Sequence, residues 1–197
     1  MFTRFVAILS LFFCSVIAQA EEQKPSAMPS ATSVNPVVIM ETDRGPVEIE
    51  LFVKEAPITT KNFLAYIDSG FYDGVIFHRT IPGFMVQTGG FGEDLKRKQT
   101  LPPIKNEANN GLKNTVGTLS MARTNDPHSA TSQIFINVNN NASLDYAGSR
   151  NAGYAVFAKV SKGMDIIHGI STVKTKRVMQ HGNVPVDPIH IVSMTRK

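Results

Sequence analysis

Short apolar segments with an alternating pattern recur along this chain, and they limit its possible folds more than any other feature. In the clearest of them, Val47, Ile49 and Leu51 alternate with Glu48 and Glu50. This is the period of two expected for a half-buried β-strand. Further strands are predicted at residues 37–40, 115–122, 133–138, 154–160 and 189–194, and residues 77–87 predict two strands joined by a Pro-Gly turn.

Only two segments predict helices. Residues 56–68 place Pro57 in a first turn, carry Phe63 and Ile67 at helical spacing, and are followed by Gly70, where a C-terminal cap is expected. The second helix, over residues 163–170, is shorter. Many strands with two helices indicate a mainly antiparallel sheet that is closed or nearly closed, because a long open edge would expose unpaired backbone groups.

The first 20 residues have the pattern of a cleaved secretory signal peptide. Arg4 gives a positive start, residues 5–18 are apolar, and Ala18-Gln19-Ala20 forms a small-x-small cleavage signal before Glu21. A retained anchor is the alternative, but a stable membrane span needs about 20 apolar residues. Residues 21–36 are rich in Ser, Ala and Pro and predict a flexible linker, so the folded domain is expected over residues 37–197.

Composition excludes several kinds of chemistry. Cleavage of the signal would remove Cys14, the only cysteine of the chain, so the mature form would have no disulfide, thiol nucleophile or thiolate metal site. About 160 residues suffice for one domain with an ordinary core. No later stretch is long and apolar enough to span a membrane, so the mature form is not expected to be membrane-embedded.

Charge and motif patterns argue against nucleic-acid, metal and cofactor binding. The net charge is +4, and the basic residues are scattered apart from small clusters at residues 96–98 and 174–177. A nucleic-acid interface would be denser and interleaved with stacking aromatics. The five histidines show no metal-ligand spacing, and there is no GxSxG elbow or phosphate-binding loop. No metal or cofactor is therefore expected.

The segment 77–87, Phe-His-Arg-Thr-Ile-Pro-Gly-Phe-Met-Val-Gln, is the best candidate for a functional site. Arg79 and Gln87 supply one cation and one amide, while Phe84 and Met85 supply apolar surface, a combination that suits a small apolar pocket with a polar edge. Alternation places Met85 with Gln87, whereas a straight strand would turn Phe84 away from them. Taken singly, Phe84 and Met85 are typical of core residues, and Arg79 is typical of a solvated or ion-paired surface residue.

Two further segments extend this candidate site. Alternation within residues 133–138 places Ile134 and Ile136 on an interior face, and Gln133, Phe135 and Asn137 on the outer face. An aromatic ring between two amides on an outer face suggests that something packs there. The long polar loop at residues 89–114 is also expected to be functional, since compact domains rarely keep such loops without a role.

These residues resemble the cyclophilins, the peptidyl-prolyl cis-trans isomerases. Residues 77–87 are similar to the family signature, and residues 117–122, 132–136, 144–145 and 154–160 are similar to later blocks in the same order. The resemblance covers residues 37–197 and is weakest after Gln87 and beyond Ile170. Residues 106–112 and 122–124 are most similar to the periplasmic cyclophilins of Gram-negative bacteria.

The resemblance implies a closed eight-stranded antiparallel β-barrel capped by two α-helices, with a proline-binding groove on its outer surface. It implies that Arg79 is the catalytic arginine. The other implied substrate contacts are Phe84, Met85, Phe135 and Leu144 in the proline pocket, Gln87 and Gln133 on the peptide backbone, and Ala122, Arg123 and Tyr154 along the groove.

Two positions depart from the family pattern. Ser143 stands where the family usually has Trp or Phe on the pocket rim, and Tyr154 stands where many members have His. The loss of a large apolar contact at Ser143 implies weak binding of cyclosporin.

The resemblance implies a rotamase that accelerates X-Pro bond rotation in exported proteins as they fold. Its expected partners are proline-containing segments of unfolded or folding proteins, its expected location is the periplasm, and it is expected to be a monomer without a cofactor. The alternative is a binding module or chaperone that holds proline segments, with incidental turnover. A nucleic-acid-binding protein is a third and weaker alternative.

Overall fold

A computed structural model of the chain describes Met1 and residues 35–197. The predicted signal peptide beyond Met1 and the predicted linker as far as residue 34 lie outside the described residues. From residue 35 onward the chain forms one compact unit. Within this described part, no helix is long and apolar enough to cross a membrane.

Eight strands form one antiparallel sheet in the order β10-β1-β2-β7-β5-β6-β4-β3. Neighbouring strands in sequence, such as β1 and β2, pair through tight turns. The strands are β1 (Val37–Thr42), β2 (Gly45–Leu51), β3 (Arg79–Ile81), β4 (Met85–Thr88), β5 (Thr118–Met121), β6 (Ile134–Asn137), β7 (Val156–Lys162) and β10 (Ile191–Arg196).

The sheet curls until the segments before its two edge strands meet. Ile76, just before β3, bridges His190, just before β10. The Phe77 N–H donates to the Ile189 carbonyl at 2.9 Å, and the Ile191 N–H donates to the Val75 carbonyl at 2.8 Å. The predicted eight-stranded antiparallel sheet with two helices is confirmed. The expected closed barrel is a curled sheet whose seam is held by this short stretch rather than by a full ladder.

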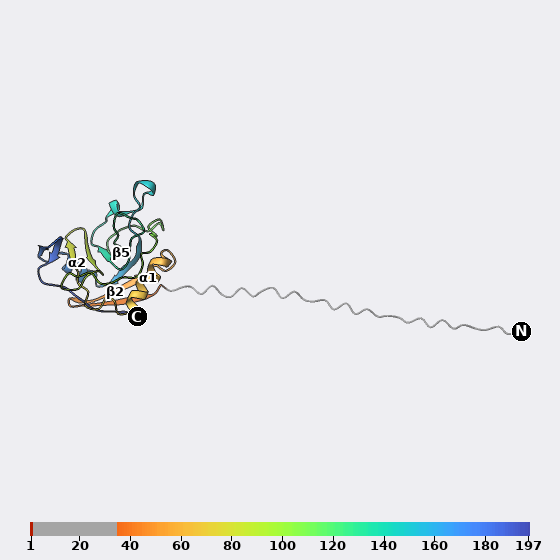
Figure 1. Cartoon of the computed structure of the whole chain (residues 1–197), viewed down its shortest axis with the longest axis horizontal. Helices are drawn as coiled ribbons and strands as arrows, with labels where there is room; N and C mark the ends of the chain where they lie inside the picture. The colour runs from red at the N-terminus through yellow and green to blue at the C-terminus, as the bar shows by residue number, and fades with distance from the viewer. Residues whose placement is uncertain (2–34) are drawn as a thin grey trace. The chain divides into compact units, whose positions relative to one another are not determined.

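The two predicted helices are present and cover different parts of the sheet (Figure 1). Helix α1 (Pro57–Asp68) begins with Pro57 in its first turn, and Gly70 follows it and donates to the Ile67 carbonyl. Helix α2 (Met164–Ser171) follows β7 directly. In Figure 1, α1 and α2 lie on either side of the strands labelled β2 and β5. Each helix buries apolar residues in the shared core.

The faces of β6 follow the predicted alternation. Ile134 and Ile136 belong to the hydrophobic core, as does Val86 of the paired strand β4. Phe135 points to the other face, where it is also buried. Asn137 shares this outer face but is completely buried, because the loop between β6 and β7 folds over it. The loop therefore covers the outer face of β6 at Asn137, whereas a pocket lies over this face at Phe135.

Several strand ends differ from prediction because turns and loops use residues that were expected to lie in strands. Residues 115–117 form a turn in which the Thr118 N–H donates to the Thr115 carbonyl at 3.0 Å. The Tyr154 N–H donates to the Leu144 carbonyl at 2.9 Å, so Tyr154 joins the loop rather than β7. Ile189 is used in the seam before β10 begins.

One hairpin was missed altogether. Strands β8 (Thr175–Val178) and β9 (His181–Pro185) form a separate two-stranded sheet that lies against β3. The exposed residues of β8 show no apolar alternation, because only β9 buries side chains, at Val184 and Pro185. Its turn contains Met179 at φ 53°, a left-handed conformation that sequence patterns do not predict for methionine.

Candidate active site

A pocket of about 220 Å³ opens on the outer face of β4 and β6. Its position follows from alternation, since Val86 points into the core while Met85 and Gln87 on either side of it face the pocket. Nine of the ten predicted site residues line it: Arg79, Phe84, Met85, Gln87, Ala122, Arg123, Phe135, Leu144 and Tyr154. The tenth, Gln133, lines an adjoining pocket.

The floor and walls of the pocket are apolar. Met85 and Phe135 are buried, while Phe84 and Leu144 are partly exposed at the sides. Phe84 reaches the pocket because it lies in the turn before β4, where its N–H donates to the Ile81 carbonyl at 3.1 Å. Gly83 in that turn has φ +70°, a conformation that favours glycine. The turn thus directs Phe84 to the same side as Met85.

The polar edge is a chain of side-chain hydrogen bonds across three strands. Arg79 on β3 donates from Nη1 to Gln87 Oε1 on β4 at 3.3 Å. Gln87 donates from Nε2 to Gln133 Oε1, next to β6, at 3.0 Å. The strand register aligns Arg79 with Gln87, and Gln87 with Phe135. Within the described residues the Arg79 guanidinium has no carboxylate partner, so most of its donors remain free for a bound molecule.

Tyr154 and Arg123 form the opposite wall. The Tyr154 ring lies edge-on to Phe135 with centroids 5.6 Å apart, and the Arg123 guanidinium lies 4.5 Å from the Tyr154 ring centroid. Arg123 also donates from Nε to the Gly153 carbonyl at 3.0 Å. Gly153 has φ +66°, and a β-carbon there would lie 2.5 Å from the backbone nitrogen of Tyr146. This close approach fixes the loop that carries Tyr154.

A buried polar network lies behind the pocket and connects its walls. Asn141 donates from Nδ2 to the Phe84 carbonyl at 2.9 Å and to Asn137 Oδ1 at 2.6 Å. Asn114 accepts from Ser120 at 2.7 Å and donates to the Asp145 carboxylate, next to Leu144, at 3.0 Å. Asn137 joins the two halves by donating to Asn114 Oδ1 at 3.3 Å. These residues hold Phe84 and the Leu144 loop at fixed positions.

The sequence does not predict this network. Its members are Asn, Ser and Asp, which in sequence indicate turns and surface loops. The available signal was Asn137, an amide at the end of an otherwise apolar strand, which alternation placed beside Phe135.

His78 precedes Arg79 and lies beneath the polar edge. Its imidazole packs against the Phe91 ring with centroids 4.7 Å apart, and it is almost completely buried. Burial lowers the pKa of His78 to about 4, assisted by the nearby charges of His181 and Arg79. His78 is therefore neutral at physiological pH and adds no charge beside Arg79.

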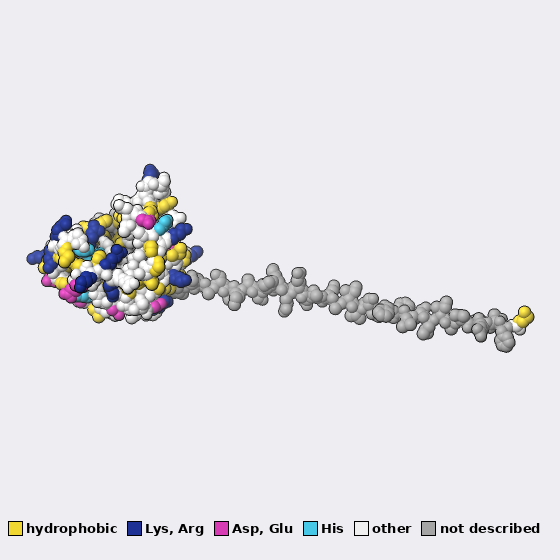
Figure 2. All heavy atoms as spheres, viewed as in Figure 1, with side chains coloured by type: hydrophobic (Ala, Val, Ile, Leu, Met, Phe, Trp, Pro, Cys, Tyr) yellow, Lys and Arg dark blue, Asp and Glu magenta, His cyan; other side chains and the backbone are white. Residues whose placement is uncertain are grey.

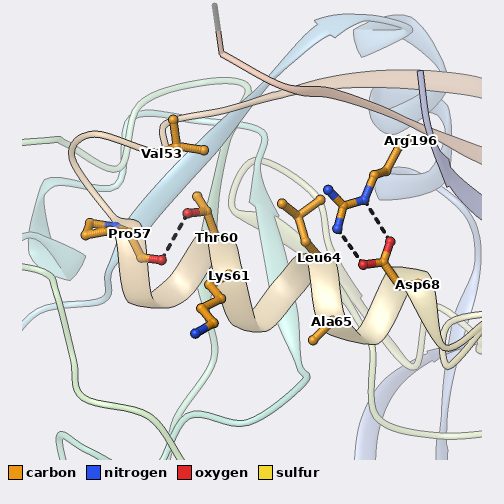
Figure 3. A pocket seen from close by; sticks show the side chains of 8 residues that line it. All are labelled: Val53, Pro57, Thr60, Lys61, Leu64, Ala65, Asp68 and Arg196. Carbon is orange, nitrogen blue, oxygen red and sulfur yellow. Dashed lines mark hydrogen bonds and ion pairs between the residues drawn. The ribbon is translucent and has the colours of Figure 1, made fainter. Parts of the chain in front are cut away.

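Larger depressions flank helix α1 but contain little that could act on a ligand. The one drawn in Figure 3, of about 510 Å³, lies along one side of α1 between Val53 and Leu64. Two of its three charged groups pair with each other, because Arg196 donates from Nε to Asp68 Oδ1 at 2.7 Å; the third is Lys61. In the part of the chain that the structure describes, no group of three His, Cys, Asp or Glu side chains could hold a metal ion.

The fold and the pocket together define a class of protein: a curled antiparallel β-barrel with an outer apolar pocket whose polar edge consists of one guanidinium and two amides. Comparison with known proteins identifies this class. Residues 37–196 match the family model described as cyclophilin type peptidyl-prolyl cis-trans isomerase/CLD.

Individual relatives agree with the family model. The chain is 55% identical over 163 residues to peptidyl-prolyl cis-trans isomerase A of Dickeya dadantii, covering 83% of this chain and 85% of that protein. It is 52% identical over 161 residues to isomerase B of Escherichia coli, covering 81% and 98% of the two chains. A crystal structure of a Cryptosporidium parvum cyclophilin-type isomerase in the presence of the dipeptide Ala-Pro aligns with a TM-score of 0.68 at 27% identity, covering 82% and 98%. The chain therefore belongs to the cyclophilin-type peptidyl-prolyl cis-trans isomerases, enzymes that rotate X-Pro peptide bonds.

Proposed function

We propose that this isomerase acts through Arg79 on proline-containing segments of exported proteins while they fold. The observation that carries the proposal is the Arg79 guanidinium, which lies at the edge of an apolar pocket and has no carboxylate partner among the described residues. The pocket volume of about 220 Å³ accommodates a proline ring. The Cryptosporidium parvum relative was crystallised in the presence of Ala-Pro, which supports a proline-containing ligand.

The chemistry requires neither a nucleophile nor a metal. An X-Pro bond resists rotation because amide resonance must be broken, at a barrier of roughly 18–20 kcal/mol. Rotation makes and breaks no covalent bond. In the twisted state the imide nitrogen regains its lone pair and can accept a hydrogen bond, which it accepts poorly when planar. A guanidinium donor directed at that nitrogen therefore stabilises the transition state more than the substrate.

The size of the barrier shows that Arg79 does not act alone. Turnover on the order of 10³ per second requires the barrier to fall by roughly 7 kcal/mol. One hydrogen bond to a charged group contributes about 1.5–3 kcal/mol. The remainder is assigned to positioning and exclusion of water. Phe84, Met85, Phe135 and Leu144 hold the ring in a site of low polarity while the preceding carbonyl turns.

The amides at the pocket edge have a positioning role as well as a binding role. Gln87 accepts from Arg79 and donates to Gln133, so the two amides orient the guanidinium. The backbone near Ala122 and Arg123 is the proposed partner of the extended peptide, and Tyr154 closes the wall beside Phe135.

Export is supported by the sequence of residues 1–20, which has the order of charged, apolar and small residues typical of a signal peptide. Together with the resemblance of residues 106–112 and 122–124 to periplasmic cyclophilins, it supports the periplasm as the proposed site of action. Fractionation of the source cells tests this location. A mature chain beginning at Glu21 in the periplasmic fraction is expected, whereas an uncleaved chain in the cytoplasm would contradict export.

Catalysis and simple binding of proline segments are distinguished by a refolding assay. The mature chain should accelerate the slow, proline-limited refolding phase of a substrate protein at substoichiometric concentration, since an isomerase turns over. A holdase that only binds unfolded segments would act at stoichiometric concentration and would slow refolding or leave its rate unchanged.

A further inference from the structure

A second pocket of about 120 Å³ adjoins the proline pocket and shares Gln87, Ala122 and Arg123 with it. It is smaller and more polar, and residues from two loops complete it. Its other lining residues are Arg97, Thr124, Ser129, Thr131 and Gln133.

Arg97 lines this pocket, whereas both of its neighbours in sequence contact other groups. Lys96 pairs with Asp94 at 3.0 Å. Lys98 donates to the Phe71 carbonyl, and its ammonium lies 4.9 Å from the centroid of the Phe71 ring. The exposed Arg97 side chain has no ion pair or hydrogen bond within the described residues. The sequence indicated only a small basic cluster at residues 96–98.

The shared wall adds a second unneutralised cation. Arg123 donates from Nε to the Gly153 carbonyl and from Nη1 to the Thr124 carbonyl. Both acceptors are neutral, and the remaining N–H groups of the guanidinium are available to a ligand. Asp126, in the same loop, accepts from the backbone of His128 at 2.9 Å and does not line either pocket. The two pockets together contain Arg79, Arg97 and Arg123 and no carboxylate among their lining residues.

We propose that the pocket around Arg97 and Arg123 selects proline segments that carry an acidic side chain close to the proline. The proposal rests on the isomerase function proposed above and names the substrate class of the same groove. An extended peptide advances about 3.3 Å per residue, so a side chain within about three residues of the proline reaches an adjoining pocket. A carboxylate there accepts hydrogen bonds from two guanidinium groups, whereas a lysine ammonium is repelled by their positive charge.

The test uses the full chain and a set of single-proline peptides. Each peptide carries Glu, Gln or Lys at one of the three positions before or after the proline and is otherwise neutral, and kcat/KM is measured for the cis isomer. At one position we expect Glu to exceed Gln by about three- to fivefold and Lys to fall below Gln, as for a partly exposed charge pair. Raising the salt to about 1 M should remove most of the preference, because the screening length falls to about 3 Å.

Arg97→Gln should remove at least half of the preference for Glu and leave kcat/KM for the Gln peptides within about twofold of wild type. Arg177→Gln, an exposed arginine on β8, is the matched control and should retain the full preference. Equal kcat/KM for Glu and Gln peptides at all positions would overturn the proposal, as would a preference unchanged in Arg97→Gln. Absence of turnover on the Gln peptides would instead contradict the isomerase function itself.

Discussion

At the scale of single residues, the proposed chemistry depends on a planar guanidinium beside an apolar surface. Arg79 is held by one hydrogen bond to Gln87, which leaves its remaining donors available to the substrate nitrogen. A lysine ammonium is a compact and strongly hydrated charge that cannot reproduce this planar geometry. The identity of the side chain is therefore expected to matter as much as its charge.

Ser143 leads to a prediction about an inhibitor. It is exposed and does not line the pocket, so the rim beside Leu144 lacks the large apolar side chain usual in the family. Ser143→Trp should tighten cyclosporin binding by about tenfold, since burying a large apolar side chain contributes 1.5–3 kcal/mol. Isothermal titration calorimetry with both proteins checks this. Equal affinities would show that position 143 does not limit binding.

His78 leads to a prediction about stability and pH. Its pKa is about 4 in the folded protein and near 6.5 when unfolded, so below pH 6.5 the unfolded state binds a proton that the native state does not. The free energy of unfolding should therefore fall by at most about 3 kcal/mol between pH 6.5 and pH 4 because of this residue alone.

Denaturant unfolding at several pH values measures this contribution. His78→Gln should flatten the decline between pH 6.5 and pH 4, whereas the exposed His168→Gln serves as the control and should keep the wild-type slope. Parallel slopes for wild type and His78→Gln would show that His78 is not the group responsible.

At the scale of elements, the loop between β6 and β7 shapes the pocket through buried amides. Asn141 immediately precedes a short helical turn at Ala142–Leu144, and its side chain donates to the Phe84 carbonyl. Asn141→Ala leaves this carbonyl and the Asn137 amide oxygen without that donor, which should cost about 2–3 kcal/mol of stability. It should also raise KM for proline peptides more than it lowers kcat, because the wall of the pocket loosens while Arg79 stays in place.

Steady-state kinetics and denaturant unfolding of Asn141→Ala check both effects. Asn109→Ala, at an exposed amide, is the matched control and should leave KM and stability unchanged. An Asn141→Ala enzyme with wild-type KM would show that the network supports the fold but not the pocket.

The elements that could be predicted from sequence are those with a periodic apolar face or with residues typical of helix ends. Strands β2 and β6 were found because one face of each lies in the core, and α1 because Pro57 and Gly70 mark its ends. The hairpin β8–β9 could not be found in this way, because its first strand is exposed and its turn depends on Met179 in a left-handed conformation.

The same limit applies to the site. Alternation predicted the common face of Met85 and Gln87, and the resemblance predicted the distant partners. Alternation could not predict the direction of Phe84, which the turn at Gly83 sets, although the resemblance implied that Phe84 lies in the pocket. Neither predicted the paired use of Asn114 and Asn141, which are far apart in sequence. Segments that are far apart in sequence and meet only in the folded protein carry no local sequence pattern that predicts their contact.

At the scale of the whole molecule, closure of the sheet explains how a small domain without a disulfide in its described part positions the site. The seam between residues 75–77 and 189–191 joins the chain just before Arg79 to the start of the last strand. Positive side chains are distributed over the visible face of the domain rather than gathered in one patch (Figure 2). The three arginines of the two pockets are notable because they converge on one groove.

The most direct test of the account is the isomerisation rate of an X-Pro peptide, measured by NMR exchange with wild type and Arg79→Ala. We expect kcat to fall by about 10- to 100-fold in Arg79→Ala, with the thermal unfolding transition and peptide affinity close to wild type. Arg79→Lys should recover little of the rate, and Arg177→Ala should match wild type. A folded Arg79→Ala protein with near-wild-type kcat would contradict the claim that this guanidinium stabilises the twisted bond.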